Sequence, residues 1–480
     1  MREPSAEEAD AIARKRAARH AKQEAARNAA PSRAQPDFAS CITARAWSPV
    51  RGAADGRNGL ASTRAGCAAP GETSRTRIRI VSWNMLAQSL VRESLFPGSD
   101  CLKMRQRVDG IAAELLTYNW DIGCFQEVDM VDLHARALTP AGYQFVYERG
   151  YDTKKHGLMI AWRAETASER PAFGAPVARH VCLLDESCPA AVLGGAHASW
   201  ARTTGLSRVT RNVALFVALP HAGRDGGVVV ATTHLFWHPR YAYERARQAA
   251  ALVCELEKFR ARDTAWASWP VVLAGDFNDQ PHSSAYSLLR GQGTPYADAI
   301  EQEVAASRVI HASVDEARAL RTVHAARTVC EEGDEARVLG RYRAADENEL
   351  FDTDMLVRMA AVGGSRGFVS TYDEAHHRLV TDESGNFFCD RREDRERSDE
   401  DPLPPPNDPR QLSSHEPRWT NYSPLFHLTL DYIFLGAQAD GYPRITALLR
   451  VHPKDVLAPG FPRRGVCASD HVMIGAEVEV

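Results

Sequence analysis

Two polar side chains, Asp276 and Asn278, stand two positions apart after the apolar residues 271–274 and a glycine. The apolar run predicts a buried strand that ends in a turn. Because residues i and i+2 of an extended chain point to the same side, both side chains should project together beyond the strand end. A carboxylate beside a carboxamide suits an oxygen-rich site, since the first can hold Mg²⁺ or a proton and the second can donate and accept hydrogen bonds.

Similar polar residues stand at or near the ends of other strand-like runs. They are acids, amides and imidazoles: Asn84, Glu127, His234, Asp431, Asp470 and His471. The set suggests a hard cation with a proton shuttle, as phosphodiester hydrolysis requires. An Asp beside a His would fix the imidazole tautomer and stabilise the imidazolium.

Each of these residues also has a simpler explanation. His234 alone would commonly be a core histidine bonded to a carbonyl, and Glu127 a solvated loop acid. Asp431 is harder to explain in this way, because it lies in the apolar run 428–434 and burial of an unpaired carboxylate is strongly unfavourable. The joint occurrence of the set favours a catalytic site over separate structural roles.

The elements that must position these residues are strands and a few helices. Apolar alternation and short apolar runs predict strands over residues 77–84, 121–127, 143–148, 157–162, 212–219, 227–234, 271–276, 428–434, 444–451 and 472–480. Helical spacing predicts helices over residues 103–117, 243–259 and 283–289, whereas residues 163–207 are irregular. Because strand and helix do not alternate regularly, we expect an α/β fold of two mostly antiparallel sheets packed face to face, with helices outside.

The segments outside this pattern are polar or charged. Residues 1–36 are rich in Ala, Arg, Lys and Glu, which predicts a solvated helix or a disordered arm, or alternatively a basic arm for RNA affinity or nuclear import. Residues 45–76 have the composition of a linker. We therefore expect a basic N-terminal arm and linker over residues 1–75 and a catalytic domain over residues 76–480. Residues 297–348 and 384–413 are interpreted as charged insertions on its rim.

Bulk properties narrow the class of protein. With a formal net charge of −4, any nucleic-acid contact needs a local basic patch. None of the ten cysteines forms a Cys-x-x-Cys pair, which argues against structural zinc and for a reducing, intracellular compartment, cytoplasmic or nuclear or both. No apolar stretch approaches the ~20 residues of a membrane span, so no membrane contact is expected.

Several short motifs carry a family resemblance. The chain resembles the endonuclease/exonuclease/phosphatase superfamily in motifs that follow the family's order: Ser82-Trp83-Asn84, Gln126-Glu127, Thr233-His234, Gly275-Asp276-Phe277-Asn278, Asp431-Tyr432-Ile433-Phe434 and Ser469-Asp470-His471. Within it, the chain resembles the deadenylase and nocturnin-like branch, and residues 420–434 look closest to the fungal Ngl-type RNA exonucleases. The resemblance covers about residues 76–290 and 415–480 and does not extend to the charged insertions.

The resemblance implies a deoxyribonuclease-I-like four-layer α/β sandwich and cleavage at phosphate with Mg²⁺, or with Mn²⁺ in its place. It implies that Glu127 is the principal metal ligand, that Asn84 lies beside it, and that Asp470 lines a second metal position. Asp276 would activate or orient the attacking water, and Asn278 would hold the scissile phosphate. His471 would contact that phosphate, and Asp431 would pair with His471. His234 would be a second phosphate contact.

Three further residues, Asn212, Pro239 and Phe426, match substrate contacts of the same branch. Pro239 and Phe426 match residues that hold an adenine between two rings, where stacking contributes ~1–3 kcal/mol; alternatively, Phe426 belongs to the core. The implied function is a 3′-end exonuclease on single-stranded RNA that trims poly(A) or rRNA. The alternatives are hydrolysis of a small adenylyl substrate, such as 2′,5′-oligoadenylate or NADP(H), and a non-catalytic RNA-binding adaptor.

Overall fold

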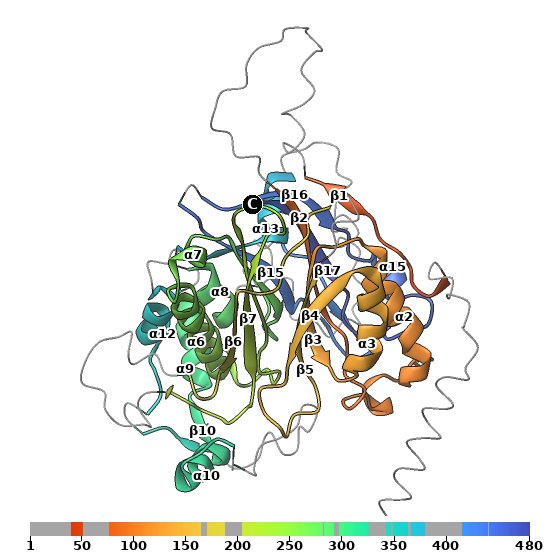
Figure 1. The fold of residues 1–480 in the computed structure, drawn as a ribbon. Coiled ribbons are helices and arrows are strands. Elements are labelled where there is room, and N and C mark those ends of the chain that lie inside the picture. The colour runs from red at the N-terminus through yellow and green to blue at the C-terminus, as the bar shows by residue number, and fades with distance from the viewer. Residues whose placement is uncertain are drawn as a thin grey trace, which may run out of the picture.

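Two β-sheets face each other, and helices cover their outer sides (Figure 1). The structure, a computed structural model, describes residues 40–50, 76–164, 170–187, 204–281, 283–291, 297–324, 326, 342–346, 349–362, 366–379, 415–439 and 441–480. This architecture confirms the predicted α/β sandwich. The predicted arm over residues 1–36 and the predicted insertion over residues 384–413 lie outside the described residues.

The first sheet has seven strands and contains the parallel pair β2–β3, while its other pairs are antiparallel. Its strands are, in spatial order, β1 (Trp47–Pro49), β16 (Arg444–Leu449), β17 (Ile474–Glu479), β2 (Arg77–Asn84), β3 (Ile122–Val128), β5 (Gly157–Arg163) and β4 (Tyr143–Glu148).

The second sheet has six strands and contains the parallel pair β8–β9, while its other pairs are antiparallel. Its strands are, in spatial order, β12 (Phe368–Ser370), β15 (Asp431–Gly436), β9 (Val271–Asp276), β8 (Gly227–His234), β7 (Val213–Pro220) and β6 (Ala178–Leu183). Two short pairs stand apart from both sheets: β10 (Val309–His311) with β11 (Tyr342–Ala344), and β13 (Asn421–Tyr422) with β14 (His427–Leu428).

The helices form the outer layers. The first sheet is covered by α2 (Met104–Thr117) and α3 (Val131–Leu138), and the second by α6 (Ala242–Arg260), α8 (Ser284–Arg290) and α12 (Thr353–Ala360) (Figure 1). The remaining helices are η2 (Glu93–Leu95), η3 (Thr139–Ala141), α7 (Thr264–Ala267), α9 (Ala297–Ala306), α10 (Ala312–Leu320), α13 (Thr371–Leu379) and α15 (Lys454–Leu457). Among the described helices, none combines the length and the apolar character that a membrane span requires.

Strand residues alternate between two hydrophobic environments, because both faces of each sheet are covered. In β2, Ile80 belongs to the core between the sheets, whereas Trp83 packs on the α2 side. In β9, Val272 faces the inner core and Leu273 packs on the α6 side. Burial of each such large side chain contributes about 1.5–3 kcal/mol. The core therefore fixes the strand ends, where the polar residues stand.

Residues 45–50, predicted as the start of a linker, join the first sheet instead. β1 pairs with β16, and Trp47 Nε1 donates to the Tyr118 carbonyl at 3.0 Å. Arg45 forms a buried ion pair with Glu114 on α2. A three-residue edge strand is too short to leave an alternation pattern in the sequence.

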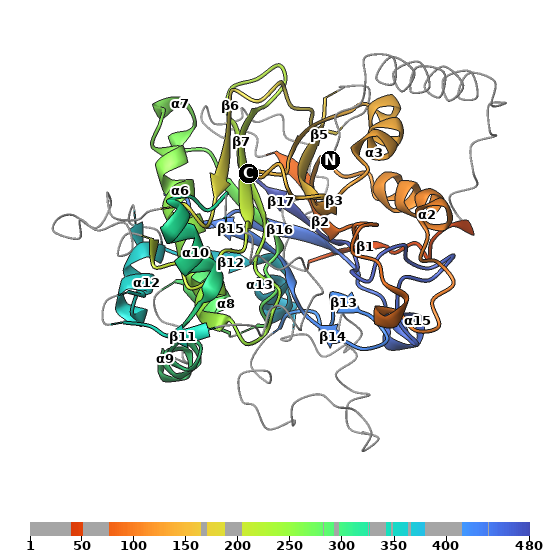
Figure 2. The same ribbon diagram turned by 90° about the horizontal axis from the view of Figure 1, so that it is seen from below.

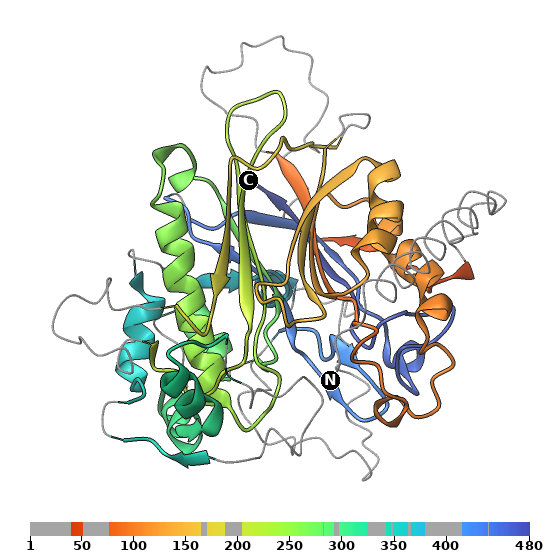
Figure 3. The same ribbon diagram turned by 60° about the horizontal axis from the view of Figure 1, so that its bottom comes forward.

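The described part of residues 297–348 is not confined to the rim. α9 packs against α6 and α8, and Figures 2 and 3 show α9 and α10 beside α6, on the side away from α2 and α3. Ile310, Val314 and Ala317 belong to the same hydrophobic cluster as the inner faces of the sheets. Their burial shows that this segment contributes to the core in spite of its charge.

Two further expectations differ from the structure. β6 lies within the stretch expected to be irregular, because an edge strand with half-buried residues shows no clean alternation. The expected strand over residues 428–434 is divided, since β14 ends at Leu428 and β15 begins at Asp431. Asp431 is thus the first residue of its strand and not an interior one.

Candidate active site

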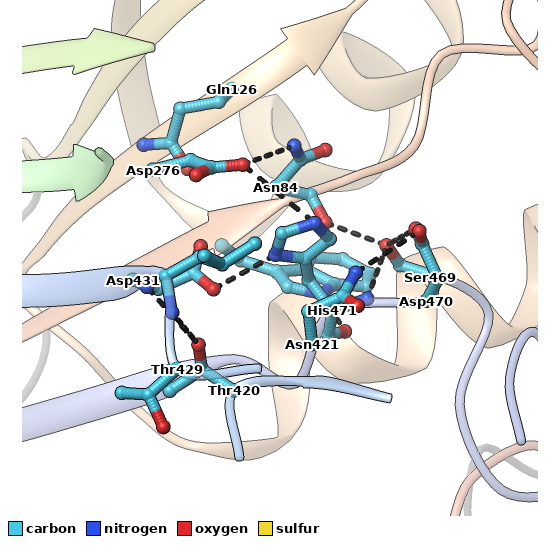
Figure 4. A network of polar contacts seen from close by, with 12 residues as sticks. Asn84, Gln126, Asp276, Thr420, Asn421, Thr429, Asp431, Ser469, Asp470 and His471 are labelled. Atoms are coloured by element: carbon cyan, nitrogen blue, oxygen red, sulfur yellow. Dashed lines mark hydrogen bonds and ion pairs between the residues drawn. The ribbon is translucent and has the colours of Figure 1, made fainter. Parts of the chain in front are cut away.

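The strand ends of both sheets bring most of the predicted residues together, and Figure 4 shows five of them: Asn84, Asp276, Asp431, Asp470 and His471. Strand pairing sets this arrangement, since Asp276 at the end of β9 is in register with His234 on β8 and with Asp431 on β15. In the other sheet, the parallel pairing of β2 with β3 sets Asn84 beside the end of β3. The residues joined in this way are Asn84, Glu127, His234, Asp276, Asn278, Asp431 and His471.

Asp431 and His471 form a buried hydrogen-bonded pair, with 2.8 Å between Asp431 Oδ2 and His471 Nδ1. Because Nδ1 faces this carboxylate, the other ring nitrogen, Nε2, lies 3.7 Å from Asp276 Oδ2. His234 Nε2 lies 3.6 Å from the same oxygen. Two imidazoles therefore approach one carboxylate oxygen from two different strand ends.

The buried charges shift each other's pKa. Burial raises the pKa of Asp276 to about 8, and Asp431 adds to the shift while His471 opposes it. Burial alone would lower the pKa of His471, but the Asp431 and Asp276 carboxylates outweigh this effect and raise that pKa well above its usual value. The pKa of Asp276 thus lies near neutral pH, as suits a group that exchanges protons, and His471 remains a charged donor.

Asn84 connects two carboxylates. Its Nδ2 donates to Glu127 Oε1 at 2.9 Å and to Asp276 Oδ2 at 3.0 Å, while its Oδ1 accepts from the Leu86 N–H at 3.0 Å. The Ala87 N–H donates to the second oxygen of Glu127 at 2.9 Å. These bonds hold the two acids in defined positions on either side of one amide.

Two residues of the cluster have a left-handed backbone. Glu127 has φ of +55° and Asn278 has φ of +48°. The pairing of β3 with β5 shifts register around Glu127, between Phe125 and Val128. Such bulges often lie next to active sites, and strain of this kind, of order 1–3 kcal/mol, persists where the surroundings require it.

Asn278 is held in place by its neighbours. Its backbone N–H donates to Asp276 Oδ1 at 2.9 Å, and its Nδ2 donates to the Leu235 carbonyl at 3.0 Å. The backbone bond to Asp276 keeps the two residues close together after β9, although the chain at Asn278 is left-handed and not extended as their spacing suggested.

Asp470 lies at the margin of the cluster and is half-buried. Its Oδ2 accepts from Asn421 Nδ2 at 3.2 Å. The adjacent Ser469 Oγ donates to the Asn84 carbonyl at 2.7 Å and accepts from the His471 N–H at 3.2 Å. Ser469 thus fixes the loop that carries His471 against the end of β2.

Sequence reasoning missed Thr420, which supports both members of the Asp–His pair (Figure 4). Its Oγ1 accepts from the Asp431 N–H at 3.1 Å, and its carbonyl accepts from the Val472 N–H at 2.7 Å. A Thr before an Asn and a Tyr carries no signal of this role by itself. The bonds become visible only when β13, β15 and the loop before β17 are placed together.

Asn212 lies behind His234 and is buried. Its Nδ2 donates to the His234 carbonyl at 2.7 Å, and its Oδ1 accepts from Gln248 Nε2 at 3.4 Å. Both ends of the amide are therefore bonded within the protein, an arrangement that positions His234.

Pro239 and Phe426 lie at the surface on two different loops. Phe426 is 56% exposed, so the alternative that it belongs to the core is wrong. Arg245, which sequence reasoning missed, fixes the Pro239 loop: it donates to the Pro239 carbonyl at 3.2 Å and lies 3.1 Å from Asp279, next to Asn278. This guanidinium connects the loop after β8 with the loop after β9.

The donor set fits a divalent cation. Three carboxylates, those of Glu127, Asp276 and Asp431, gather with two imidazoles, and within the described chain Asp431 Oδ1 is buried without a hydrogen-bond donor. Buried anions require a compensating charge, and oxygen ligands suit Mg²⁺. Ligand atoms of Asp276, Asp431 and His471 also lie within 4.8 Å of one another, a set that differs from the predicted ligands.

A comparison with protein families identifies the class to which this sandwich and its acid–imidazole cluster belong. The chain is a member of the Endonuclease/Exonuclease/phosphatase family, whose sequence pattern matches residues 81–471. The match includes every motif that carried the resemblance in the sequence.

Particular relatives agree with the predicted branch. A probable RNA exonuclease of Schizosaccharomyces pombe is 33% identical over 228 residues, 46% of this chain and 40% of that protein. The RNA exonuclease NGL2 of Saccharomyces cerevisiae is 30% identical over 243 residues, 46% of this chain and 43% of that protein. The matches thus span less than half of these relatives. The human 2′,5′-phosphodiesterase 12 is 27% identical over 239 residues, 46% of this chain and 37% of that protein.

A solved structure shows the same fold. The crystal structure of ANGEL2, a 2′,3′-cyclic phosphatase, in complex with adenosine-2′,3′-vanadate aligns over 92% of this chain and 99% of that chain, with a TM-score of 0.51 and 17% identity. The deoxyribonuclease-I-like sandwich expected from the sequence is thereby confirmed.

Proposed function

We propose that this protein is a divalent-metal-dependent exonuclease that releases nucleotides from the 3′ end of single-stranded RNA. The observation that carries the proposal is the position of Asp276, which shares the Asn84 amide with Glu127 and faces His234 and His471. The RNA exonucleases among its relatives support RNA as the substrate. The free thiols of four described cysteines, Cys101, Cys124, Cys182 and Cys467, support a reducing, intracellular compartment.

The residues divide the work of hydrolysis among them. Asp276 accepts the proton of the attacking water, whose oxygen bonds to phosphorus while the bond to the upstream 3′ oxygen breaks. The 3′ oxygen leaves as a hydroxyl after it takes a proton from solvent. His471, held by Asp431, donates a hydrogen bond to a phosphoryl oxygen, and His234 supplies a second contact. Asn278 orients the phosphate. Glu127 and Asn84 would hold Mg²⁺ or Mn²⁺, with Asp470 at a second position, and the ion would polarise a phosphoryl oxygen.

The resemblance of Pro239 and Phe426 to the adenine-stacking residues of the deadenylase branch favours poly(A) or an adenine-rich rRNA end as the substrate. Phe426 projects from the hairpin of β13 and β14, and Pro239 follows β8, so each presents a ring at the surface. Stacking on such rings stabilises a base by ~1–3 kcal/mol. We therefore assign them to the terminal adenine.

Product analysis tests the proposal. An RNA labelled on its 3′-terminal nucleotide should release AMP when Mg²⁺ is present, and EDTA or Glu127→Ala should stop the release. The same RNA with a blocked 3′ end should remain intact. Internal fragments from the blocked RNA would contradict an exonuclease and indicate an endonuclease.

A small adenylyl substrate is the second candidate, because the family relatives include 2′,5′-phosphodiesterase 12. Faster hydrolysis of 2′,5′-linked triadenylate or NADP(H) than of 3′,5′-linked triadenylate would favour it. An adaptor without activity is disfavoured, since a buried group of acids is unfavourable for folding and an adaptor has no use for it. Inactivity of the wild type on every one of these substrates would favour the adaptor.

A further inference from the structure

A pocket opens beside the acid cluster and shares one of its residues. His234, whose Nε2 lies 3.6 Å from Asp276 Oδ2, forms part of its wall. The other lining residues come from the loop between β4 and β5, from the start of β5 and from β7: Arg149, Lys154, His156, Gly157, Leu158 and Val213. The pocket therefore leads from the reacting centre toward a basic loop.

Two glycines allow this loop to approach the sheets. Gly150 has φ of +75°, and a Cβ there would stand 2.3 Å from Val213 Cγ1. A Cβ on Gly157 would stand 2.2 Å from the Glu148 carbonyl oxygen. Any larger residue at either position would push the loop outward and change the wall of the pocket.

The loop is also held from outside. Arg211 donates to Thr153 Oγ1 at 3.1 Å and to the Ala326 carbonyl at 2.6 Å. The buried ring of Tyr151 lies 4.9 Å from the ring of His324. His324 and Ala326, which belong to no family motif, thus help to fix the loop in place.

The charge of the pocket is opposite to that of the neighbouring acids. Arg149 is exposed and Lys154 is half-buried, while His156 and His234 are each 6% exposed. Glu148, next to the loop, is paired with Arg179. Because the chain carries a net charge of −4 and the centre gathers carboxylates, a polyanionic substrate needs local cations to approach it.

We propose that this pocket binds a second phosphate of the substrate, the one next to the scissile phosphate. The proposal rests on the proposed function. A 3′-terminal nucleotide ends in a hydroxyl, so in RNA the neighbouring phosphate must lie one nucleotide upstream. A dinucleotide with a pyrophosphate would offer the same chemistry from a different source, and the experiment separates the two.

The test compares triadenylate with a triadenylate whose upstream linkage is a neutral methylphosphonate. Wild type should release terminal AMP from the neutral analogue roughly tenfold more slowly, as expected for one lost charge-assisted contact. Lys154→Met should lose a similar factor on normal triadenylate and show little further loss on the analogue, because the two changes remove the same contact. For Lys154→Met, the slope of log rate against log salt concentration should be shallower than that of wild type by about 0.7.

Lys155→Met is the matched control, since it removes the same charge from the next residue of the loop, which does not line the pocket. It should discriminate between the two RNAs as wild type does. Equal rates of wild type on both RNAs, or full discrimination by Lys154→Met, would overturn the proposal while leaving the exonuclease intact.

A binding measurement separates this proposal from the proposed function. Both trinucleotides are titrated in EDTA, where no turnover occurs. If wild type binds normal triadenylate more tightly than the neutral analogue and Lys154→Met does not, the pocket is supported. If wild type then releases no AMP in Mg²⁺, the exonuclease is contradicted. If only a pyrophosphate-containing dinucleotide shows dependence on Lys154, the upstream phosphate of RNA is the wrong source.

Discussion

Two buried groups of charged side chains differ in how their charges are balanced. Under α6, Arg247 donates to Glu244 Oε1 at 2.8 and 2.7 Å, and Ser207 donates to the other oxygen of Glu244 at 3.0 and 2.6 Å. At the strand ends, by contrast, the carboxylates of Asp276 and Asp431 lie close together with imidazoles as their cationic partners. In the first group both carboxylate oxygens of Glu244 accept hydrogen bonds, whereas in the second, within the described residues, Asp431 Oδ1 accepts none.

This difference separates a structural network from a reactive one. In the first group, each oxygen of the acid already has a donor, so a ligand could add nothing. In the second, Asp431 Oδ1 is buried without a donor in the described chain, and the pKa of Asp276 is raised to about 8 by burial. Such perturbed groups are typical of functional sites.

The largest expected effect comes from Asp276→Asn. The amide keeps the shape but cannot accept the proton of water, so AMP release should fall by roughly 10³-fold. Folding should not suffer, because a buried carboxylate beside Asp431 is replaced by a neutral group. Calorimetry should therefore show an unchanged or higher Tm. A clear fall in Tm with activity retained would show that Asp276 belongs to a structural network and not to a reactive one.

The opposite pattern is expected for Arg247→Met. Among the described residues, Arg247 is the cation bonded to Glu244. Its removal leaves a buried acid without charge compensation, which should lower the free energy of unfolding by about 3–5 kcal/mol. Urea unfolding measures this change. The control is Lys258→Met on the same helix, which breaks a partly exposed pair with Glu255 and should alter stability by less than about 1 kcal/mol.

The part of the site that sequence could predict follows from strand register. His234, Asp276 and Asp431 end or begin buried strands, and their motifs marked them before the pairing was known. Sequence could not show that the amide of Asn212 faces the His234 carbonyl, because a residue type does not reveal the direction of its side chain. Nor could it show that Thr420 contacts two distant segments.

The strands also divide into those that sequence could predict and those that it could not. β8 and β9 were predictable because both of their faces are buried and their apolar runs are continuous. In the two large sheets, the strands that were missed are β1, β6 and β12, and all three lie at a sheet edge. Edge strands have one partner and a partly exposed face, so their sequences need not alternate.

A smaller effect is expected for Phe426→Ala. If the ring stacks on the terminal base, its loss should raise the transition-state free energy by ~1–3 kcal/mol for RNAs ending in A and so slow their cleavage. RNAs ending in U should change little. Tm should hardly change, because the ring is exposed. Leu425→Ala, at the neighbouring position that is 52% exposed, is the control. Equal losses on both RNA ends would refute a role in base preference.

A buried acid of intermediate character gives a further test. Glu416 accepts from the Tyr286 hydroxyl at 2.9 Å, and burial, together with Asp373, raises its pKa to about 8. Because the unfolded carboxyl has a pKa near ~4.3, the folded state retains a proton between these values, so Glu416 lowers stability as pH rises from about 4 to 8.

Glu416→Gln tests this pH dependence, since the amide stays neutral at every pH. The Tm of wild type relative to the variant should decline between pH 5 and about 8 and level off above that range. A constant difference across this range would show that Glu416 is ionised throughout and that its charge is balanced as in the α6 group.

Binding of Mn²⁺, followed by the electron paramagnetic resonance of the free ion, tests most directly whether the acid cluster is a metal site. Wild type should remove Mn²⁺ from solution, Mg²⁺ should displace it, and Glu127→Gln should bind it at least tenfold more weakly while Glu244→Gln binds as wild type does. Failure of wild type to bind, or equal binding by Glu127→Gln, would contradict the account.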